Sequence, residues 1–203
     1  IDSFANNEYD ILLGTQMISK GLDFKNVTLV GIINADTSLN IPDFRAGEKT
    51  FSLLYQTSGR AGRDKKEGEV IIQTFNPDNQ ILNFVKENDY EGFYKYEMDI
   101  RHKLKYPPYT YICSIVIKSK NYEEVSKEAN KIKNILQKNI DKKTILYGPA
   151  PASVFKVNNI YNFVITIKYT FDDNLKRIIK LIDEEYALNK NINIEVTFNP
   201  SRF

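Results

Sequence analysis

The sequence predicts an α/β fold in two parts, an α/β block followed by a small α+β block. In the first half, short apolar runs rich in β-branched residues alternate with helical patterns, which is typical of parallel strands joined by helices. In the second half, several segments alternate strictly between apolar and polar residues, which indicates half-buried strands. A Tyr-Pro-Pro-Tyr segment interrupts the helical pattern between the halves, because the residue before a proline disfavours helix. The predicted domains are 1–104, a linker at 105–109, and 110–203.

The first block is built from strands and helices in alternation. The apolar runs are short enough for strands, and Phe51, Leu54 and Tyr55 fall on one face of a helix. The predicted elements are strands at 11–13, 27–33 and 70–74, a helix from Phe44 to about Gly59 capped by Asp43, a helix opened by Pro77 and a helix over 90–104.

The second block shows two helical stripes among four strand patterns. One stripe runs from Val125 to Leu136 and the other from Leu175 to Tyr186. Strands are predicted at 111–117, 144–147, 161–168 and 192–198. The resulting order is βαββαβ, which is a ferredoxin-like pattern with both helices on one face of an antiparallel sheet.

Composition is that of an ordinary globular protein, with 42% hydrophobic and 27% charged residues among 203. No apolar run approaches the roughly 20 residues of a membrane helix, so no membrane partner is expected. Cys113 is the single cysteine, which excludes an internal disulfide and a multi-cysteine zinc site in this sequence and favours a cytoplasmic location. Because the net charge is only +2, any nucleic-acid contact must be local. The absence of an initial Met suggests a piece of a longer protein.

A glycine- and arginine-rich segment follows the predicted helix of the first block. Gln56, Gly59, Arg60 and Arg63 are spaced i, i+3, i+4 and i+7, so a continuing helix would carry all four on one face. Guanidinium groups bind phosphate oxygens through paired donors, and an arginine aimed at a transferring γ-phosphate stabilises the transition state. Alone, the segment fits a solvated helix end equally well, because cations also complement the helix dipole.

A polar loop directly follows the first predicted strand, reading Gly-Thr-Gln and then Lys-Gly-Leu-Asp a few residues later. The C-terminal edge of a parallel sheet is where α/β folds bind ligands. Thr15 and Gln16 offer donors to a backbone phosphate or to a neighbouring motif. Gly21 permits a turn with positive φ or close approach of a ligand, and Asp23 could accept from a ribose hydroxyl or orient an arginine. Alone, the loop is more typical of a polar connection with a capping aspartate.

Together, the two segments resemble motifs V and VI of superfamily 2 helicases, and the pairing is far more specific than either part. The wording of the chain also resembles the bacterial replication-restart helicase family PriA (primosomal protein N′). The matching stretches are 11–21, 43–46, 56–63, 68–74, Arg101, 104–109 and 148–152. The resemblance implies a partial RecA-like helicase lobe of the P-loop NTPase type at 1–104, followed by the α+β domain.

The resemblance also implies roles in nucleotide binding. Arg63 and Arg60 would be catalytic, contacting the γ-phosphate of ATP, with Arg63 as the arginine finger. Gly21 and Asp23 would lie near the sugar of the nucleotide. Gln56 would join contacts at the ATP site and between lobes.

Further implied roles concern nucleic acid and partners. Thr15, Gln16 and Lys20 would bind DNA and link it to the ATP site. The implied partners are branched or forked DNA, single-stranded-DNA-binding protein and primosome proteins.

The sequence departs from the helicase pattern in what it lacks. It has no Gly-x-x-x-x-Gly-Lys-Ser/Thr phosphate loop, no acidic Mg²⁺ motif and no cysteine cluster. ATP and Mg²⁺ are therefore expected to bind between this chain and a lobe outside this sequence. Zinc is expected only in the intact protein, outside this sequence. This chain alone is expected to be inactive. Two other functions stay open: a non-catalytic DNA- or protein-binding module, and a superfamily 2 RNA helicase fragment.

Overall fold

The computed structural model describes residues 1–15, 26–59 and 68–201 of the 203-residue chain. The chain forms two compact units, Ile1–Asp99 and Ile100–Phe203, which are described separately. The boundary between them falls within a helix, ahead of the linker predicted at 105–109.

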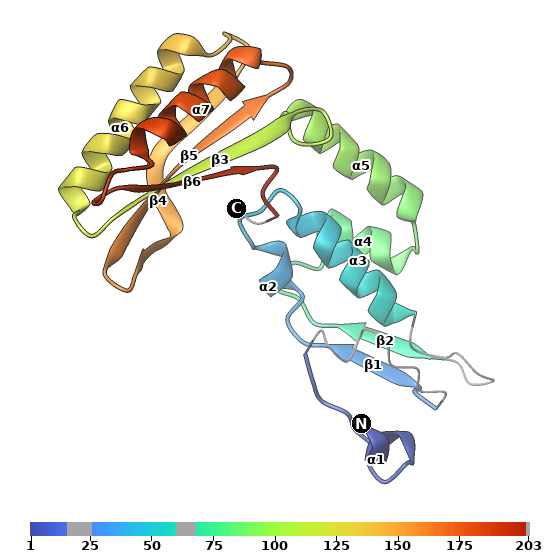
Figure 1. Cartoon of the computed structure of the whole chain (residues 1–203). Helices are drawn as coiled ribbons and strands as arrows, with labels where there is room; N and C mark the ends of the chain where they lie inside the picture. The colour runs from blue at the N-terminus through green and yellow to red at the C-terminus, as the bar shows by residue number, and fades with distance from the viewer. Residues whose placement is uncertain (16–25, 60–67, 202–203) are drawn as a thin grey trace. The chain divides into compact units, whose positions relative to one another are not determined.

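The first unit combines a small parallel sheet with helices (Figure 1). Strands β1 and β2 pair in parallel, with Leu29 opposite Glu69 and Ile32 opposite Ile72. The elements are α1 (Asp2–Ala5), β1 (Leu29–Ile32), α2 (Asp36–Leu39), α3 (Ala46–Ser58), β2 (Glu69–Ile72), α4 (Gln80–Lys86) and α5 (Tyr90–Lys103), the last of which continues past the unit boundary.

The core of this unit lies around helix α3. The ring of Phe51 stacks on that of Phe93 with centroids 4.0 Å apart, which joins α3 to α5. Leu54, one turn further along α3, is 1% exposed. Leu82 and Val85 add the buried side of α4. Apolar burial of this kind, and not helix propensity, supplies most of the stability of a helix in a folded protein.

Three predicted elements of the first block need correction. Residues 11–13 do not form a strand, and Ile11 and Leu13 are 84% and 82% exposed, because no described strand pairs with them. Helix α3 begins at Ala46 instead of Phe44. Helix α4 begins at Gln80, after the predicted start at Pro77.

The cap of α4 explains its later start. The side chain of Asn79 accepts a hydrogen bond from the backbone N–H of Ile81 at 2.9 Å. Asparagine is among the preferred N-cap residues because it satisfies a donor that the helix leaves unpaired. The cap therefore sets the helix start, and Pro77 lies in the preceding turn.

The second unit has the predicted order of elements. Its elements are β3 (Tyr111–Ser119), α6 (Tyr122–Asn139), β4 (Ile145–Val157), β5 (Ile160–Tyr169), α7 (Asp173–Tyr186) and β6 (Asn193–Phe198). The sheet order is β4-β5-β3-β6, and every neighbouring pair is antiparallel. Helices α6 and α7 cover one face of this sheet (Figure 1).

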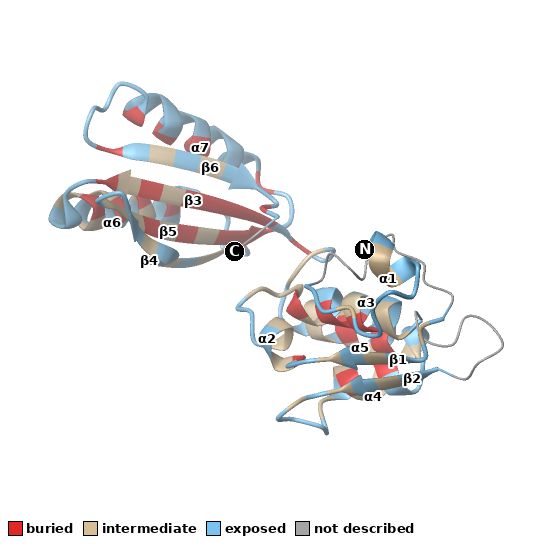
Figure 2. Ribbon diagram, turned by 90° about the horizontal axis from the view of Figure 1, so that it is seen from below, coloured by how far each residue is buried: buried red, intermediate tan, exposed pale blue. Residues whose placement is uncertain are grey.

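The core of the second unit lies between its sheet and its two helices. Strands β3 and β5 occupy the middle of the sheet and are the most buried, as Figure 2 shows. Cys113, Ile115 and Ile117 on β3 are all 0% exposed and pack with the buried stripe of α6. Burial raises the pKa of the Cys113 thiol to about 12, so this cysteine acts as a small apolar core residue.

The segment from Arg101 to Thr110, which includes the linker predicted at 105–109, belongs to the second unit and contacts its strand β5. The amine of Lys168, 5% exposed, donates to the carbonyl of Leu104 at 3.0 Å. The same amine lies 3.4 Å from the ring centroid of Tyr106. Burial lowers the pKa of Lys168, and the carbonyl and the ring supply the negative potential that a buried cation needs.

Strand β4 contains the Gly-Pro-Ala-Pro-Ala stretch at 148–152. The stretch lies within the strand, where its pairing with β5 shifts register between Tyr147 and Ala150. Gly148 adopts φ +91°, and a Cβ there would lie 2.6 Å from the carbonyl oxygen of Val164. Only glycine fits this backbone, because other residues combine the φ penalty with that clash.

Replacing Asp172 with asparagine is expected to destabilise the second unit by about 1–3 kcal/mol. The buried carboxylate caps α7 through the N–H of Leu175 at 2.9 Å. It also accepts from the N–H of Asp141 at 3.0 Å and the hydroxyl of Thr144 at 2.8 Å. Urea unfolding of the two proteins at neutral pH measures the difference.

Lowering the pH should reduce the stabilisation that the Asp172 carboxylate gives to the second unit. Burial acts to raise the pKa of Asp172, but the hydrogen bonds from Asp141, Leu175 and Thr144 outweigh it and leave the pKa below its usual value. A lowered folded-state pKa means stability that is fully present above the unfolded pKa of about 3.9 and is lost as pH falls through the folded value. The difference in the free energy of unfolding between the parent protein and Asp172→Asn should therefore become smaller below about pH 4. A difference that does not depend on pH would contradict this assignment.

Candidate nucleotide and nucleic-acid site

Helix α3 is the described element that leads to the predicted arginine segment. Its start is fixed by Asp43, whose Oδ1 accepts from the backbone N–H and the Nε of Arg45 at 2.9 and 3.1 Å. The other carboxylate oxygen accepts from the amine of Lys49 at 2.8 Å. Burial acts to raise the pKa of Asp43, but these bonds outweigh it and hold the pKa below its usual value. Asp43 thus forms a turn ahead of the helix and does not cap it as predicted.

One face of α3 is buried and the other carries Gln56. Phe51 and Leu54 pack into the core, whereas Gln56 is exposed. The helix ends at Ser58 and is followed by Gly59. The two arginines that the sequence places on the face of Gln56 lie outside the described residues.

Two of the eight predicted site residues lie in the described part of the chain. Thr15 and Gln56 are both exposed. The other six lie outside the described residues, so their arrangement stays a prediction. These six are Gln16, Lys20, Gly21, Asp23, Arg60 and Arg63.

The carboxyl ends of β1 and β2 are tied together by Asp36. Its Oδ1 accepts from the hydroxyl of Thr74 at 2.9 Å, and its Oδ2 accepts from the N–H of Phe75 at 2.9 Å. The bond from Phe75 is the main reason that the pKa of Asp36 is lowered. The backbone of Ala35 also donates to Gln73 at 3.0 Å. The carboxyl ends of these two parallel strands, the edge at which parallel sheets bind ligands, therefore have a backbone fixed by these hydrogen bonds.

Sequence reasoning missed the role of Asp36. The signal available was an Asn-Ala-Asp sequence directly after an apolar run, a pattern typical of the polar end of a strand. Its partners, Thr74 and Phe75, are 38 and 39 residues away. Only the pairing of β1 with β2 brings them within reach.

The described residues contain no group of three or more His, Cys, Asp and Glu side chains arranged to hold a metal ion. Among the helices of the described ranges, none combines the length and apolar character needed to cross a bilayer.

Comparisons with known proteins connect both units to replication proteins. Residues 1–65 match the helicase conserved C-terminal domain, and residues 102–201 match the primosomal protein N C-terminal domain. The replication restart protein PriA of Bacillus subtilis is 42% identical over 203 residues, covering 98% of this chain and 25% of that protein. PriA of Borreliella burgdorferi is 38% identical, covering 98% and 30%. PriA of Rickettsia felis is 35% identical, covering 100% and 31%.

The mixed α/β fold and the match over residues 1–65 place this chain in the class of proteins that have a helicase C-terminal lobe. Together with the second match and the identity over nearly the whole chain, they show that the chain belongs to the PriA family of replication restart proteins. The chain spans about a quarter to a third of the length of these relatives.

Proposed function

We propose that this chain is part of an ATP-dependent DNA helicase that restarts stalled replication forks and helps to load the primosome. Within that enzyme the chain supplies the arginine-finger half of the ATPase site. Arg63 stabilises the γ-phosphate in the transition state, and Arg60 contacts the same group. The chain has no phosphate loop of its own, so it acts together with a lobe outside this sequence.

One observation carries the proposal: both motif segments fall within the 65 residues that match the helicase domain. The first follows Leu13 and the second begins in the last turn of helix α3, and both belong to the unit that contains the parallel strands β1 and β2. In that unit Asp36 fixes the carboxyl ends of the strands, and Gln56 is exposed on the helix that precedes the arginines. These features support a ligand site at that edge.

The finer fold assignments belong to the same proposal. Residues 1–104 form part of a RecA-like lobe of the P-loop NTPase type, which the parallel pairing of β1 with β2 supports. Residues 110–203 form a ferredoxin-like domain, which the antiparallel order β4-β5-β3-β6 with α6 and α7 on one face supports.

Ligands and partners follow from the proposed activity. ATP and Mg²⁺ bind between this lobe and its partner lobe, with Gly21, Asp23 and Gln56 on this side. Thr15, Gln16 and Lys20 contact DNA. Forked DNA is the substrate, and single-stranded-DNA-binding protein and primosome proteins are the partners. Zinc binds outside this chain, because Cys113 is its only cysteine.

The test compares nucleic acids as activators of ATP hydrolysis by the intact protein. Forked DNA is expected to stimulate hydrolysis more than unbranched DNA, and RNA of matched length and sequence is expected to stimulate it least. A steady-state assay of phosphate release measures all three. Stronger stimulation by RNA would favour an RNA motor, and no hydrolysis with any of them would favour a non-catalytic binding module.

A further inference from the structure

The sheet of the second unit has one face that helices α6 and α7 leave open (Figure 1), and this open face is closely covered at one end. Ile112 on β3 and Lys168 on β5 are cross-strand partners. Their neighbours Cys113 and Ile167 belong to the core beneath the helices, so Ile112 and Lys168 point to the open face. They are nevertheless buried, whereas Val164, further along that face, is only half-buried. A second layer therefore covers the end of the open face at Ile112 and Lys168.

The covering layer includes the segment that joins helix α5 to strand β3, residues 101–110, which we call the strap. The amine of Lys168 donates to the carbonyl of Leu104 at 3.0 Å. The same amine lies 3.4 Å from the ring centroid of Tyr106 and 5.3 Å from that of Tyr147, which belongs to β4. One amine thus contacts the strap at two points and the neighbouring strand at a third.

Within the strap, backbone hydrogen bonds form short turns. The N–H of Tyr106 donates to the carbonyl of Arg101 at 2.8 Å, and the N–H of Tyr109 donates to that of Tyr106 at 3.0 Å. Turns this short are marginally stable in water by themselves. The two prolines at 107 and 108 have no N–H with which to bond to the sheet. The strap therefore depends on side-chain contacts such as that of Lys168 to stay ordered.

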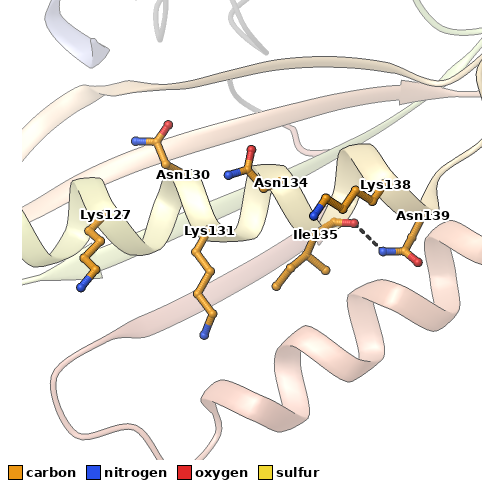
Figure 3. A pocket seen from close by; sticks show the side chains of 7 residues that line it. All are labelled: Lys127, Asn130, Lys131, Asn134, Ile135, Lys138 and Asn139. Carbon is orange, nitrogen blue, oxygen red and sulfur yellow. Dashed lines mark hydrogen bonds between the residues drawn. The ribbon is translucent and has the colours of Figure 1, made fainter.

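The contact at Lys168 has neutral partners. Among the described residues, no carboxylate pairs with its amine. Lys131 differs, because it lines a shallow groove on α6 (Figure 3) and donates to the carboxylate of Glu185 at 2.8 Å. A buried amine needs hydrogen-bonding or aromatic partners, but water can replace both once the strap lifts. The net stabilisation is therefore a small part of the strength of the bond in the closed state, which makes the contact reversible.

The strap and the sheet beneath it differ in local stability. Leu104 and Tyr109 in the strap are exposed, whereas Ile115 on β3 and Ile165 on β5 are fully buried. Proteins open locally where buried apolar contacts are few and stay closed where they are many. The strap should therefore open without unfolding of β3 and β5.

We propose that the strap opens and closes as a local unit over the end of the open face, that the amine of Lys168 holds it closed, and that the closed strap transmits movement of helix α5 to the second unit. Helix α5 begins in the first unit, where Phe93 stacks on Phe51, and its last residues belong to the second. The transmission rests on the proposed function, because it requires the first unit to move when ATP is hydrolysed.

Hydrogen exchange followed by mass spectrometry, on the intact protein without ATP or DNA, tests the strap. Lys168→Met keeps the length of the side chain but removes the amine. Loss of a hydrogen bond to a charged group corresponds to about 10- to 100-fold in a local equilibrium, so peptides that cover the strap should exchange about 10- to 100-fold faster. Peptides from β3 and β5 should keep the parental rates.

Tyr106→Leu is the second variant, because it removes the ring from the strap and leaves the sheet sequence intact. It should also accelerate exchange of the strap, since the amine loses an aromatic partner. If Lys168→Met disturbs the folding of β5, this variant decides. Unchanged strap exchange in Lys168→Met would overturn the proposal, as would equal acceleration of the strap, β3 and β5 in Tyr106→Leu.

Lys156→Met is the matched control. The amine of Lys156 also lies over a tyrosine ring, 4.6 Å from the centroid of Tyr161, but this lysine is exposed on β4. Its replacement removes the same charge and the same kind of ring contact from the same sheet. Exchange of the strap should stay at the parental rate, and acceleration equal to that in Lys168→Met would overturn the assignment.

The transmission is tested by the number of base pairs of forked DNA unwound for each ATP hydrolysed. Lys168→Met and Tyr106→Leu should lower this ratio while ATP hydrolysis stays near the parental rate, and Lys156→Met should leave both unchanged. A contact that only stabilises the fold would not lower the ratio. Faster exchange of the strap with an unchanged ratio would therefore overturn the transmission.

Failure of this inference can be told from failure of the proposed function. If the parent protein does not hydrolyse ATP in the presence of DNA, the proposed function fails and the transmission fails with it. Exchange is measured without ATP, so it still decides whether the amine of Lys168 holds the strap closed.

Discussion

Replacing Arg63 with alanine in the intact protein is expected to lower the maximal rate of DNA-stimulated ATP hydrolysis by about 10³-fold or more. In the proposed role, the guanidinium group of Arg63 stabilises negative charge that develops on the γ-phosphoryl oxygens in the transition state, so its loss is expected to act on kcat. Affinity for DNA should change little, because the proposed finger contacts the nucleotide and not DNA. Steady-state hydrolysis at saturating ATP and DNA, with DNA binding measured separately, distinguishes the two effects.

Two further variants sharpen this test. Arg63→Lys keeps the charge but loses the planar pair of donors, so it should recover only a small part of the rate. Arg177→Ala removes an exposed arginine from α7 in the other unit and should leave hydrolysis near the parent rate. If Arg63→Ala hydrolysed ATP as fast as the parent, the finger assignment would be wrong.

Replacing Phe51 with alanine is expected to destabilise the first unit by about 3–5 kcal/mol. The ring is 2% exposed and lies between that of Phe93, stacked at 4.0 Å, and that of Tyr55 at 5.4 Å. Its removal leaves a cavity between α3 and α5 in addition to the lost burial. Because α3 leads to the arginine segment, ATP hydrolysis should also become more sensitive to heat.

Hydrogen exchange followed by mass spectrometry measures this effect locally. Peptides from α3 and α5 should lose protection in Phe51→Ala, while peptides from the sheet of the second unit should keep theirs. Phe75→Ala is the matched control, because the same side chain is 88% exposed there and surface substitutions usually change stability by less than about 0.5 kcal/mol. Equal losses of protection in the two variants would contradict the assigned core.

Much of the fold could be predicted from the local periodicity of apolar residues. The alternation in 111–117 and 161–168 correctly indicated β3 and β5, and the stripes of Val125–Leu136 and Leu175–Tyr186 correctly indicated α6 and α7. Apolar residues on a buried face recur every 3.6 residues in a helix and every second residue in a strand, so these elements can be predicted from neighbouring residues alone. The pairing of two motif segments likewise indicated a helicase, because their order is a property of the sequence.

By itself, then, the sequence determined the kinds and order of the elements in the second unit, and the family. The tertiary structure alone decided that 11–13 forms no strand, that Asp43 makes a turn, and that Asp36 and Asp172 tie distant segments together. It also placed Lys168 beneath the segment that the sequence indicated as a linker. The physical reason is that each of these features depends on a partner outside the local segment, such as a pairing strand, a carbonyl or a buried donor. The periodicity of apolar residues within a segment contains no information about where that partner will lie.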